Sequence, residues 1–108
     1  MTYSEYRATL KYELCRLNWE NPSWLQWLRM KYLQPNTNCM YLARKMWYLH
    51  EKGKIGRLLA KCLYLRIHRK YGCTIYPNAQ VGKGFFISHP VGIVLGKCEI
   101  GEDFMIYH

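Results

Sequence analysis

The four histidines are the side chains of this sequence best suited to moving protons, and they stand at positions 50, 68, 89 and 108. An imidazole ring in general titrates near neutral pH, so a histidine can accept a proton from a hydroxyl group that attacks a carbonyl. Taken alone, a histidine beside a proline, such as His89 beside Pro90, is more often structural or exposed than catalytic. Ser88 precedes it, but adjacent side chains of a strand point to opposite faces, so we do not expect a Ser–His nucleophile pair.

The remaining reactive groups do not form a recognisable site. The histidines and cysteines show no metal-ligand spacing, so we expect no bound metal. The odd number of cysteines and the lack of a CxxC pair predict reduced, mostly buried thiols. These cysteines are Cys15, Cys39, Cys62, Cys73 and Cys98. Gly82-Lys83-Gly84 resembles a phosphate-binding loop, but it lacks the spacing of a P-loop or a dinucleotide fingerprint, and a corner of the repeat described below explains it.

The composition is that of one small folded domain. The chain has 108 residues, of which 50% are hydrophobic and 21% are charged, far from the polar composition of disordered chains. No stretch approaches the roughly 18 consecutive apolar residues of a membrane span, and the start, MTYSEYRATLKY, lacks the apolar segment of a secretory signal. We therefore expect a cytoplasmic protein.

Positive charge is concentrated in the first two thirds of the chain. Residues 1–72 hold 14 Lys and Arg against 4 Asp and Glu, whereas residues 73–108 hold 2 against 3. A basic, aromatic-rich segment can bind nucleic acid or lie on an anionic membrane surface. It can equally be a solvated helix face whose Lys and Arg stems cover apolar surface. Because no nucleic-acid-binding motif accompanies the charge, we expect no nucleic-acid partner, and membrane contact has no further support in the sequence.

The basic segment is expected to form about three helices. The first is interrupted at Pro22 and ends before Pro35. The second begins with Asn36 or Thr37 as N-cap and ends at Gly53.

The third helix is expected over about residues 54–71, with Gly72 as its left-handed cap. Its apolar residues are spaced mostly by three and four, which predicts a stripe buried in the core. The stripe consists of Ile55, Leu58, Leu59, Cys62, Leu65, Ile67 and Tyr71.

After Gly72 the hydrophobic period changes to six, with one seven-residue unit over residues 93–99. The recurring aliphatic residues are Ile75, Val81, Ile87, Ile93, Ile100 and Ile106. Helices and ordinary strands have periods of 3.6 and 2, so neither explains this step. A triangular β-coil does, because each six-residue side supplies one short strand, one corner and one inward aliphatic residue. The sequence therefore predicts an α+β protein, with a helical segment over residues 1–72 and a coil of parallel strands over residues 73–108.

The run GCTIYPNAQVGKGFFISHPVGIVLGKCEIGEDFMIY resembles the hexapeptide-repeat acyltransferases, and within them the serine acetyltransferases and their polysaccharide O-acetyltransferase relatives. The shared features are a basic helix ending in Tyr-Gly, an Ile-x-Pro corner, Val-Gly-x-Gly, and a His followed by Gly-Ile-Val. The resemblance implies a left-handed parallel β-helix, of which this chain holds about two coils. It also implies a homotrimer, with acetyl-CoA bound as co-substrate between neighbouring subunits.

The resemblance gives His89 the role of the general base that takes the proton from the acceptor hydroxyl. Thr74 stands where serine acetyltransferases have an Asp that supports this histidine, and a hydroxyl cannot stabilise an imidazolium as a carboxylate does. The motif His-Pro-x-Gly-Ile-Val looks more like that of the saccharide enzymes, and this favours a saccharide hydroxyl over L-serine as the acceptor. His108 falls where the family has Gln or His, so it could line the substrate cleft or have a structural role.

Two coils are few for such a fold, because repeat arrays generally need three or more units. In the resembling family the later coils carry most of the acetyl-CoA contacts, and this sequence stops within a repeat. We therefore expect an N-terminal portion of an enzyme, with little or no acetyltransferase activity alone. The alternative is a non-catalytic binding or oligomerisation module whose basic helices contact a membrane surface or nucleic acid.

Overall fold

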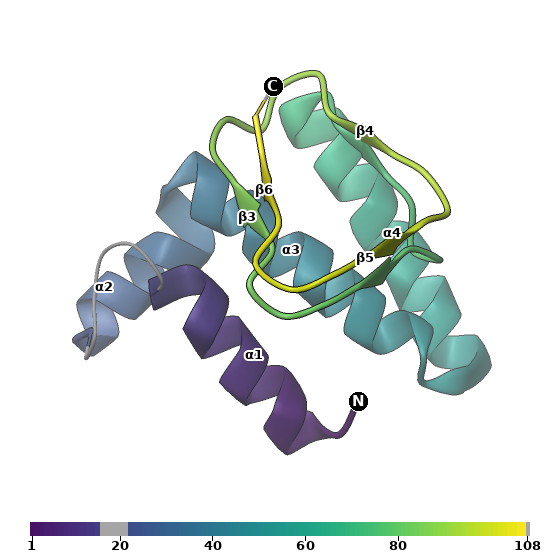
Figure 1. Cartoon of the computed structure of the whole chain (residues 1–108), viewed down its shortest axis with the longest axis horizontal. Helices are drawn as coiled ribbons and strands as arrows, with labels where there is room; N and C mark the ends of the chain where they lie inside the picture. The colour runs from purple at the N-terminus through teal and green to yellow at the C-terminus, as the bar shows by residue number, and fades with distance from the viewer. Residues whose placement is uncertain (16–21, 108) are drawn as a thin grey trace.

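The computed structural model describes residues 1–15 and 22–107. Its helices are α1 (Tyr3–Cys15), α2 (Trp24–Leu28), the π-helix η1 (Arg29–Leu33), α3 (Pro35–His50) and α4 (Gly53–Tyr71). Its strands are β1 (Thr74–Ile75), β2 (Gln80–Val81), β3 (Phe86–Ile87), β4 (Val94–Leu95), β5 (Glu99–Ile100) and β6 (Met105–Ile106). α3 runs through the middle of the molecule and packs against α1, η1, α4 and β3, while the strands cover one side of the helices (Figure 1).

Two helix ends follow local sequence signals. Ser23 caps α2 through a capping box, in which its side chain accepts from the Gln26 N–H and the Gln26 side chain accepts from the Ser23 N–H. α4 ends at Gly72, which has a left-handed φ of 65°, as the sequence predicts.

The start of α3 differs from the prediction. The sequence predicts Asn36 or Thr37 as N-cap, but α3 begins at Pro35 and its N-cap is Gln34. Proline suits the first helical position because its φ is already helical and no N–H is needed there. Thr37 instead lies buried inside the helix. Pro35 therefore opens a helix where the sequence analysis expected it only to close one.

The strands pair in parallel, each with the third strand that follows it. β1 pairs with β4, β2 with β5 and β3 with β6. The chain therefore completes one turn for every three strands. We name residues 74–87 the first turn and residues 94–106 the second turn.

The register corrects the predicted alignment of the two turns. The inward pairs are Ile75 with Leu95, Val81 with Ile100 and Ile87 with Ile106. Ile93, which the six-residue count aligns with Ile75, lies two residues before the true partner. The extra length falls between β3 and β4, where the chain bends around Pro90, and not within residues 93–99 as predicted.

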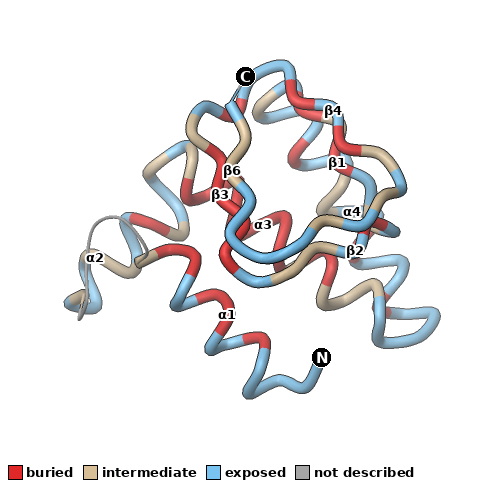
Figure 2. Tube along the Cα trace, viewed as in Figure 1, coloured by how far each residue is buried: buried red, intermediate tan, exposed pale blue. Residues whose placement is uncertain are grey.

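The hydrophobic core joins the helices to the coil. It follows α3 and the inner side of the first turn, where buried residues are most continuous (Figure 2). All six repeat aliphatics belong to this core or pack against it. Ile75, Ile87 and Ile93 are buried, and Val81, Ile100 and Ile106 are half-buried. The repeat therefore predicts the inward residue of every strand except β4, where Leu95 takes the place of Ile93.

The predicted core stripe of α4 is wrong for most of its residues, because the buried residues of this helix are Gly56, Ala60 and Ile67. The exposed members of the stripe are Ile55, Leu58, Leu59, Cys62 and Leu65. Small residues decide which side faces the core because they let α4 approach α3 closely. A Cβ added at Gly56 would lie 2.1 Å from the Leu49 carbonyl oxygen. Within the described ranges no helix, α4 included, is both long and apolar enough to cross a membrane.

Candidate functional site

His89 lies in the loop that joins the two turns, residues 88–93, between β3 and β4. Its side chain is exposed, whereas the next residue, Pro90, is buried. The Val91 N–H donates a hydrogen bond of 2.9 Å to the His89 carbonyl oxygen, which folds the backbone tightly around Pro90. The imidazole is therefore presented to solvent from a backbone that a buried proline holds in place.

Backbone hydrogen bonds hold both ends of this loop. The Ser88 N–H donates to the Ile106 carbonyl in β6 at 3.0 Å, and the Thr74 N–H in β1 donates to the Ile93 carbonyl at 2.8 Å. The loop that carries His89 thus ends in direct backbone contact with Thr74, the residue that the sequence resemblance aligns with an Asp.

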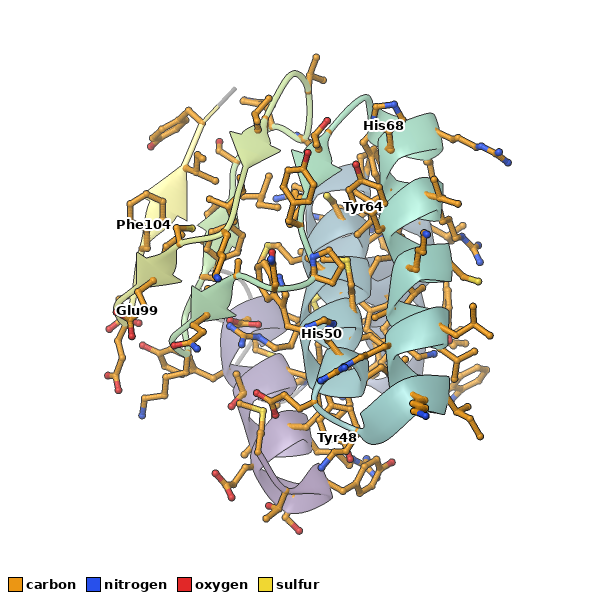
Figure 3. The ribbon with its side chains drawn as sticks, turned by 90° about the vertical axis from the view of Figure 1, so that its right-hand side faces the viewer. Tyr48, His50, Tyr64, His68, Glu99 and Phe104 are labelled. Carbon is orange, nitrogen blue, oxygen red and sulfur yellow. The ribbon has the colours of Figure 1, made fainter. Side chains whose placement is uncertain are left out.

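The Thr74 side chain meets a second histidine at the end of α4. Thr74 Oγ1 lies 3.4 Å from His68 Nδ1. The Tyr64 ring stacks on His68 and on Tyr76, with centroid separations of 6.5 and 5.5 Å. Figure 3 shows Tyr64 and His68 along one side of α4. We name these four residues the His68 cluster.

The sequence analysis did not identify the His68 cluster because its members come from two different kinds of structure. Tyr64 and His68 are one helical turn apart, and Tyr76 directly follows β1, two residues after Thr74, so each pair shares a side. The signal that could have joined them is Gly72, whose left-handed backbone turns the strand back toward the helix. The cluster places polar side chains beside the strand that the His89 loop contacts.

A buried ion pair attaches the first turn to the helices. The Arg44 guanidinium on α3 contacts both carboxylate oxygens of Glu13 on α1, at 2.6 and 3.0 Å. It also donates to the carbonyls of Val81 at 2.9 Å and Gly82 at 2.8 Å. Glu13 in turn accepts from the Phe85 N–H at 3.0 Å. Burial raises the pKa of Glu13, and the Arg44 ion pair and the backbone donors oppose that rise.

Trp47, one helical turn after Arg44, makes a further attachment. Its indole Nε1–H donates to the Tyr76 carbonyl at 3.1 Å. Its ring also packs edge-on against Phe85, with centroids 5.4 Å apart. The residues of α3 therefore hold the first turn on both sides of β2, which fixes the base from which the His89 loop leaves the coil.

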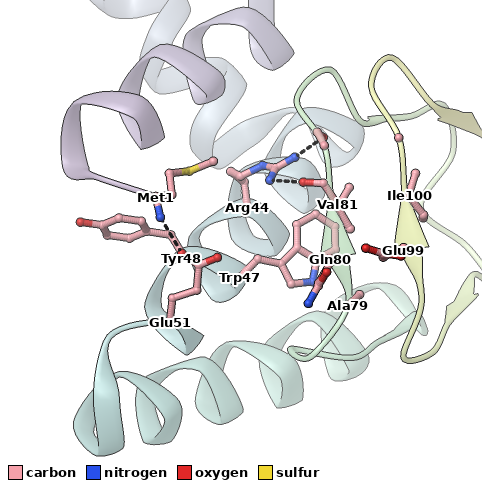
Figure 4. Close-up of a pocket in the computed structure, with 12 residues that line it drawn as sticks. Met1, Arg44, Trp47, Tyr48, Glu51, Ala79, Gln80, Val81, Glu99 and Ile100 are labelled. Atoms are coloured by element: carbon pink, nitrogen blue, oxygen red, sulfur yellow. Dashed lines mark hydrogen bonds and ion pairs between the residues drawn. The ribbon is translucent and has the colours of Figure 1, made fainter.

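A cavity of about 520 Å³ lies between α3, the N-terminal residue and the β2–β5 pair (Figure 4). Glu51 on its wall accepts a hydrogen bond from the Met1 amino group at 3.1 Å. Its lining residues include none from the His89 loop or the His68 cluster. This cavity is therefore separate from the loop that carries His89.

The other predicted site features are placed as follows. His108 lies outside the described residues. In the part of the chain that the structure describes, no group of three or more His, Cys, Asp or Glu side chains could hold a metal ion. The described cysteines are all free, with Cys39 and Cys73 buried and Cys62 exposed. Burial raises the pKa of the Cys39 thiol.

Comparison with known proteins finds serine acetyltransferases among the relatives of this chain. No family model matches the chain. The chain is 32% identical over 100 residues to a serine acetyltransferase of Helicobacter pylori, and this alignment covers 92% of the chain and 57% of that protein. It is also 32% identical over 82 residues to the serine acetyltransferase of Mycobacterium tuberculosis, covering 75% of the chain and 35% of that protein. The chain is a homologue of the serine acetyltransferases.

Solved structures of serine acetyltransferases share the fold of this homologue. The soybean enzyme, complexed with serine, superimposes with a TM-score of 0.75 at 24% identity, over 97% of this chain and 43% of that one. The Neisseria gonorrhoeae enzyme in complex with serine superimposes with a TM-score of 0.75 at 21% identity, over 98% and 43%. At these identities the likeness shows the fold, which is helical with short strands. The chain spans little more than half of its Helicobacter relative and less than half of each solved structure.

Proposed function

We propose that this protein is an acetyl-CoA-dependent O-acetyltransferase in which His89 is the general base. In this proposal residues 73–108 form the first coils of a left-handed β-helix, and three copies assemble with acetyl-CoA bound between neighbours. The observation that carries the proposal is the position of His89. Its side chain is exposed, on a loop between two coil turns, in a homologue of serine acetyltransferases.

The proposed reaction moves an acetyl group from the sulfur of CoA to a hydroxyl oxygen. The His89 imidazole accepts the hydroxyl proton while that oxygen forms a bond to the thioester carbonyl carbon. Backbone N–H groups of the coil stabilise the negative oxygen of the tetrahedral intermediate. When the carbon–sulfur bond breaks, the imidazolium returns the proton to sulfur, so that CoA leaves as a thiol and the imidazole is regenerated.

The acceptor is proposed to be a small hydroxyl compound, either L-serine or a saccharide. The relatives are named serine acetyltransferases, and two solved neighbours are complexes with serine. The His-Pro-Val-Gly-Ile-Val run resembles the saccharide branch, and Thr74 stands where the serine enzymes have an Asp. A direct assay with both acceptors separates the two.

The test is release of free CoA from acetyl-CoA in the presence of L-serine or a panel of mono- and oligosaccharides. CoA is measured chromatographically, because the exposed thiol of Cys62 would react with thiol reagents. The 108-residue chain alone is expected to show little or no turnover, since the matched segment is only 57% of its Helicobacter relative. The second protein tested is therefore a chimera in which this chain replaces that segment.

We expect the chimera to release CoA with at least one acceptor. In the chimera, His89→Ala should lower the rate by about 10²- to 10⁴-fold, the usual contribution of a general base. A folded chimera that acetylates no acceptor, or one whose rate is the same without His89, would contradict the proposal.

Thr74 allows a second test of the role of His89. A carboxylate at this position would stabilise the imidazolium that forms during proton transfer, which a hydroxyl cannot do. We therefore expect Thr74→Asp to raise the turnover of the chimera by about tenfold or more, whereas the neutral isostere Thr74→Asn should not raise it. Equal effects of the two substitutions would show that charge at position 74 does not act on the reaction.

A further inference from the structure

One side of α4 combines exposed apolar side chains with positive charge. We name its apolar residues the outer face of α4: Ile55, Leu58, Leu59, Cys62 and Leu65. The most exposed of them, Ile55 and Leu58, are 77% and 63% exposed. At 3.6 residues per turn these positions lie opposite the residues of α4 that pack on the core. Figure 3 shows α4 at one edge of the molecule, with side chains that point away from the other helices.

Cations border the outer face along its length. The helix carries six Lys and Arg residues and no Asp or Glu: Lys54, Arg57, Lys61, Arg66, Arg69 and Lys70. All six are exposed. Near the C-terminal end of the helix, three of these cations line a shallow hollow together with Cys62 and Leu65. Apolar and positively charged groups therefore share one surface.

We propose that the outer face of α4 binds an anionic membrane surface, with its aliphatic side chains inserted among the headgroups and its cations in contact with lipid phosphate. Helices that lie in a membrane interface combine an apolar face with bordering Lys and Arg residues. In such a helix the opposite side is usually polar and solvated. In α4 the opposite side packs against α3, so the body of the protein takes the place of the polar face. The proposal does not depend on acetyltransferase activity.

Charge favours a membrane over a second copy of the chain as the occupant of this face. Two copies that met through their outer faces would bring two sets of cations together, with no anion of α4 between them, and like charges across an interface are unfavourable. An anionic bilayer supplies the opposite charge over the whole face. Each Lys or Arg held near such a surface strengthens binding about fivefold.

The charges of the rest of the molecule would orient it on the membrane. The coil carries the acidic residues Glu99, Glu102 and Asp103, which are exposed. Figure 3 places Glu99 at the edge of the molecule opposite α4. With α4 on an anionic surface, Glu99 lies on the far side of the molecule, so its repulsion from the membrane is small.

The test measures binding of the full chain to vesicles by co-flotation. The vesicles are phosphatidylcholine alone, or phosphatidylcholine with a third of the lipid replaced by phosphatidylglycerol. We expect binding to the anionic vesicles only, and weaker binding as salt is added, because salt screens the surface charge. No binding to the anionic vesicles would overturn the proposal.

Two matched double variants test the apolar contribution. Ile55→Gln with Leu58→Gln removes side chains that are 77% and 63% exposed on the outer face, and Leu33→Gln with Leu25→Gln removes side chains of the same exposures on η1 and α2. The first pair should lower the partition coefficient on anionic vesicles about tenfold or more, and the second less than about twofold. Circular dichroism checks that both remain folded. Equal losses would overturn the assignment to α4.

A second matched pair tests the charge. Arg66→Gln with Arg69→Gln and Arg29→Gln with Lys97→Gln each remove two exposed cations, but only the first pair removes them from α4. We expect the partition coefficient on anionic vesicles to fall by about tenfold or more for the first pair and by about twofold for the second. Equal losses would show that net charge alone drives binding. If the chain instead self-associates and Ile55→Gln with Leu58→Gln abolishes that association without affecting vesicle binding, the occupant is a second copy.

Discussion

The two turns of the coil share one pattern of backbone pairing but differ in what supports them. The first turn is held by Glu13, Arg44 and Trp47, whose side chains hydrogen-bond to its backbone. Among the described residues, the second turn is joined to the helices by a different kind of bond, the 2.6 Å hydrogen bond that the Tyr12 hydroxyl on α1 donates to the Asp103 side chain. Ile87 in the first turn is fully buried, whereas its partner Ile106 is half-buried.

This difference shows what the helical layer does for the coil. A repeat unit cannot bury its hydrophobic residues alone and normally relies on a neighbouring unit on each side. Here α1 and α3 take the place of the neighbour that would precede the first turn. The first turn then serves as the base for the second, and the His89 loop is built between the two.

Removal of the Arg44 side chain is expected to have the largest effect on stability. Arg44→Met leaves the Glu13 carboxylate buried without its partner and frees two carbonyls of the first turn. We expect the free energy of unfolding, measured by urea denaturation, to fall by about 3–5 kcal/mol. Lys45→Met, the same change at the next residue, should cost less than about 1 kcal/mol because that side chain is only half-buried. Equal losses from both would mean that the ion pair does not hold the first turn.

The paired residues Ile87 and Ile106 test the contrast in burial directly. Ile87→Ala should destabilise the chain by about 3–4 kcal/mol, because it opens a cavity in a fully buried site. Ile106→Ala, at the half-buried partner position, should cost about 1–2 kcal/mol. Both values come from the same urea titration. If Ile106→Ala destabilises the chain as much as Ile87→Ala or more, the first turn is not the better supported of the two turns.

Glycines in the two turns should also differ in their tolerance of a methyl group. A Cβ at Gly82 would lie 2.9 Å from the Gly101 carbonyl carbon, in the adjacent turn, whereas a Cβ at Gly101 meets nothing within 4 Å. Gly82→Ala is therefore expected to lower the thermal midpoint, with a loss of about 1–3 kcal/mol. Gly101→Ala should change stability by less than about 1 kcal/mol. If Gly82→Ala is neutral, the two turns are not in close contact at this corner.

Cysteine reactivity should give the smallest signal and needs no substitution. Cys73, at the entry to the first turn, is buried, and Cys98, at the entry to β5, is half-buried. Under native conditions iodoacetamide should modify Cys98 at least about tenfold faster, because Cys73 reacts only after local opening. Cys62, which is exposed, serves as the internal reference for a free thiol. Faster modification of Cys73 would show that the first turn opens more readily than the second.

The features that the sequence predicts correctly are those that local spacing determines. Gly72 ends α4 because a left-handed residue is needed there, and the aliphatic repeat after it identifies the inward side chain of every strand except β4, where Leu95 takes the place of Ile93. The Arg44–Glu13 pair could not be predicted, because its residues are 31 positions apart and only the packing of α1 on α3 brings them together. The true register of the turns also depends on a local bend, at Pro90, that interrupts the count of six.

The wrong assignment of the α4 face has a different cause. A stripe of Ile and Leu at helical spacing predicts an apolar surface, but it does not say whether that surface meets the core or something outside the molecule. Gly56 and Ala60 determine which side of α4 faces the core, because their small size allows α3 to approach on that side. The sequence resemblance gives His89 the role of general base, and the structure shows only that this residue is exposed. Its chemical role stays a prediction.

That role, removal of the acceptor's proton by the imidazole at position 89, is tested most directly by chemical rescue. In the chimera with the Helicobacter relative, His89→Gly should abolish acetyl transfer, and free imidazole should restore it in proportion to its concentration. The matched variant His68→Gly should show no such restoration. A His89→Gly enzyme that keeps its full rate, or one that imidazole does not restore, would contradict the assignment.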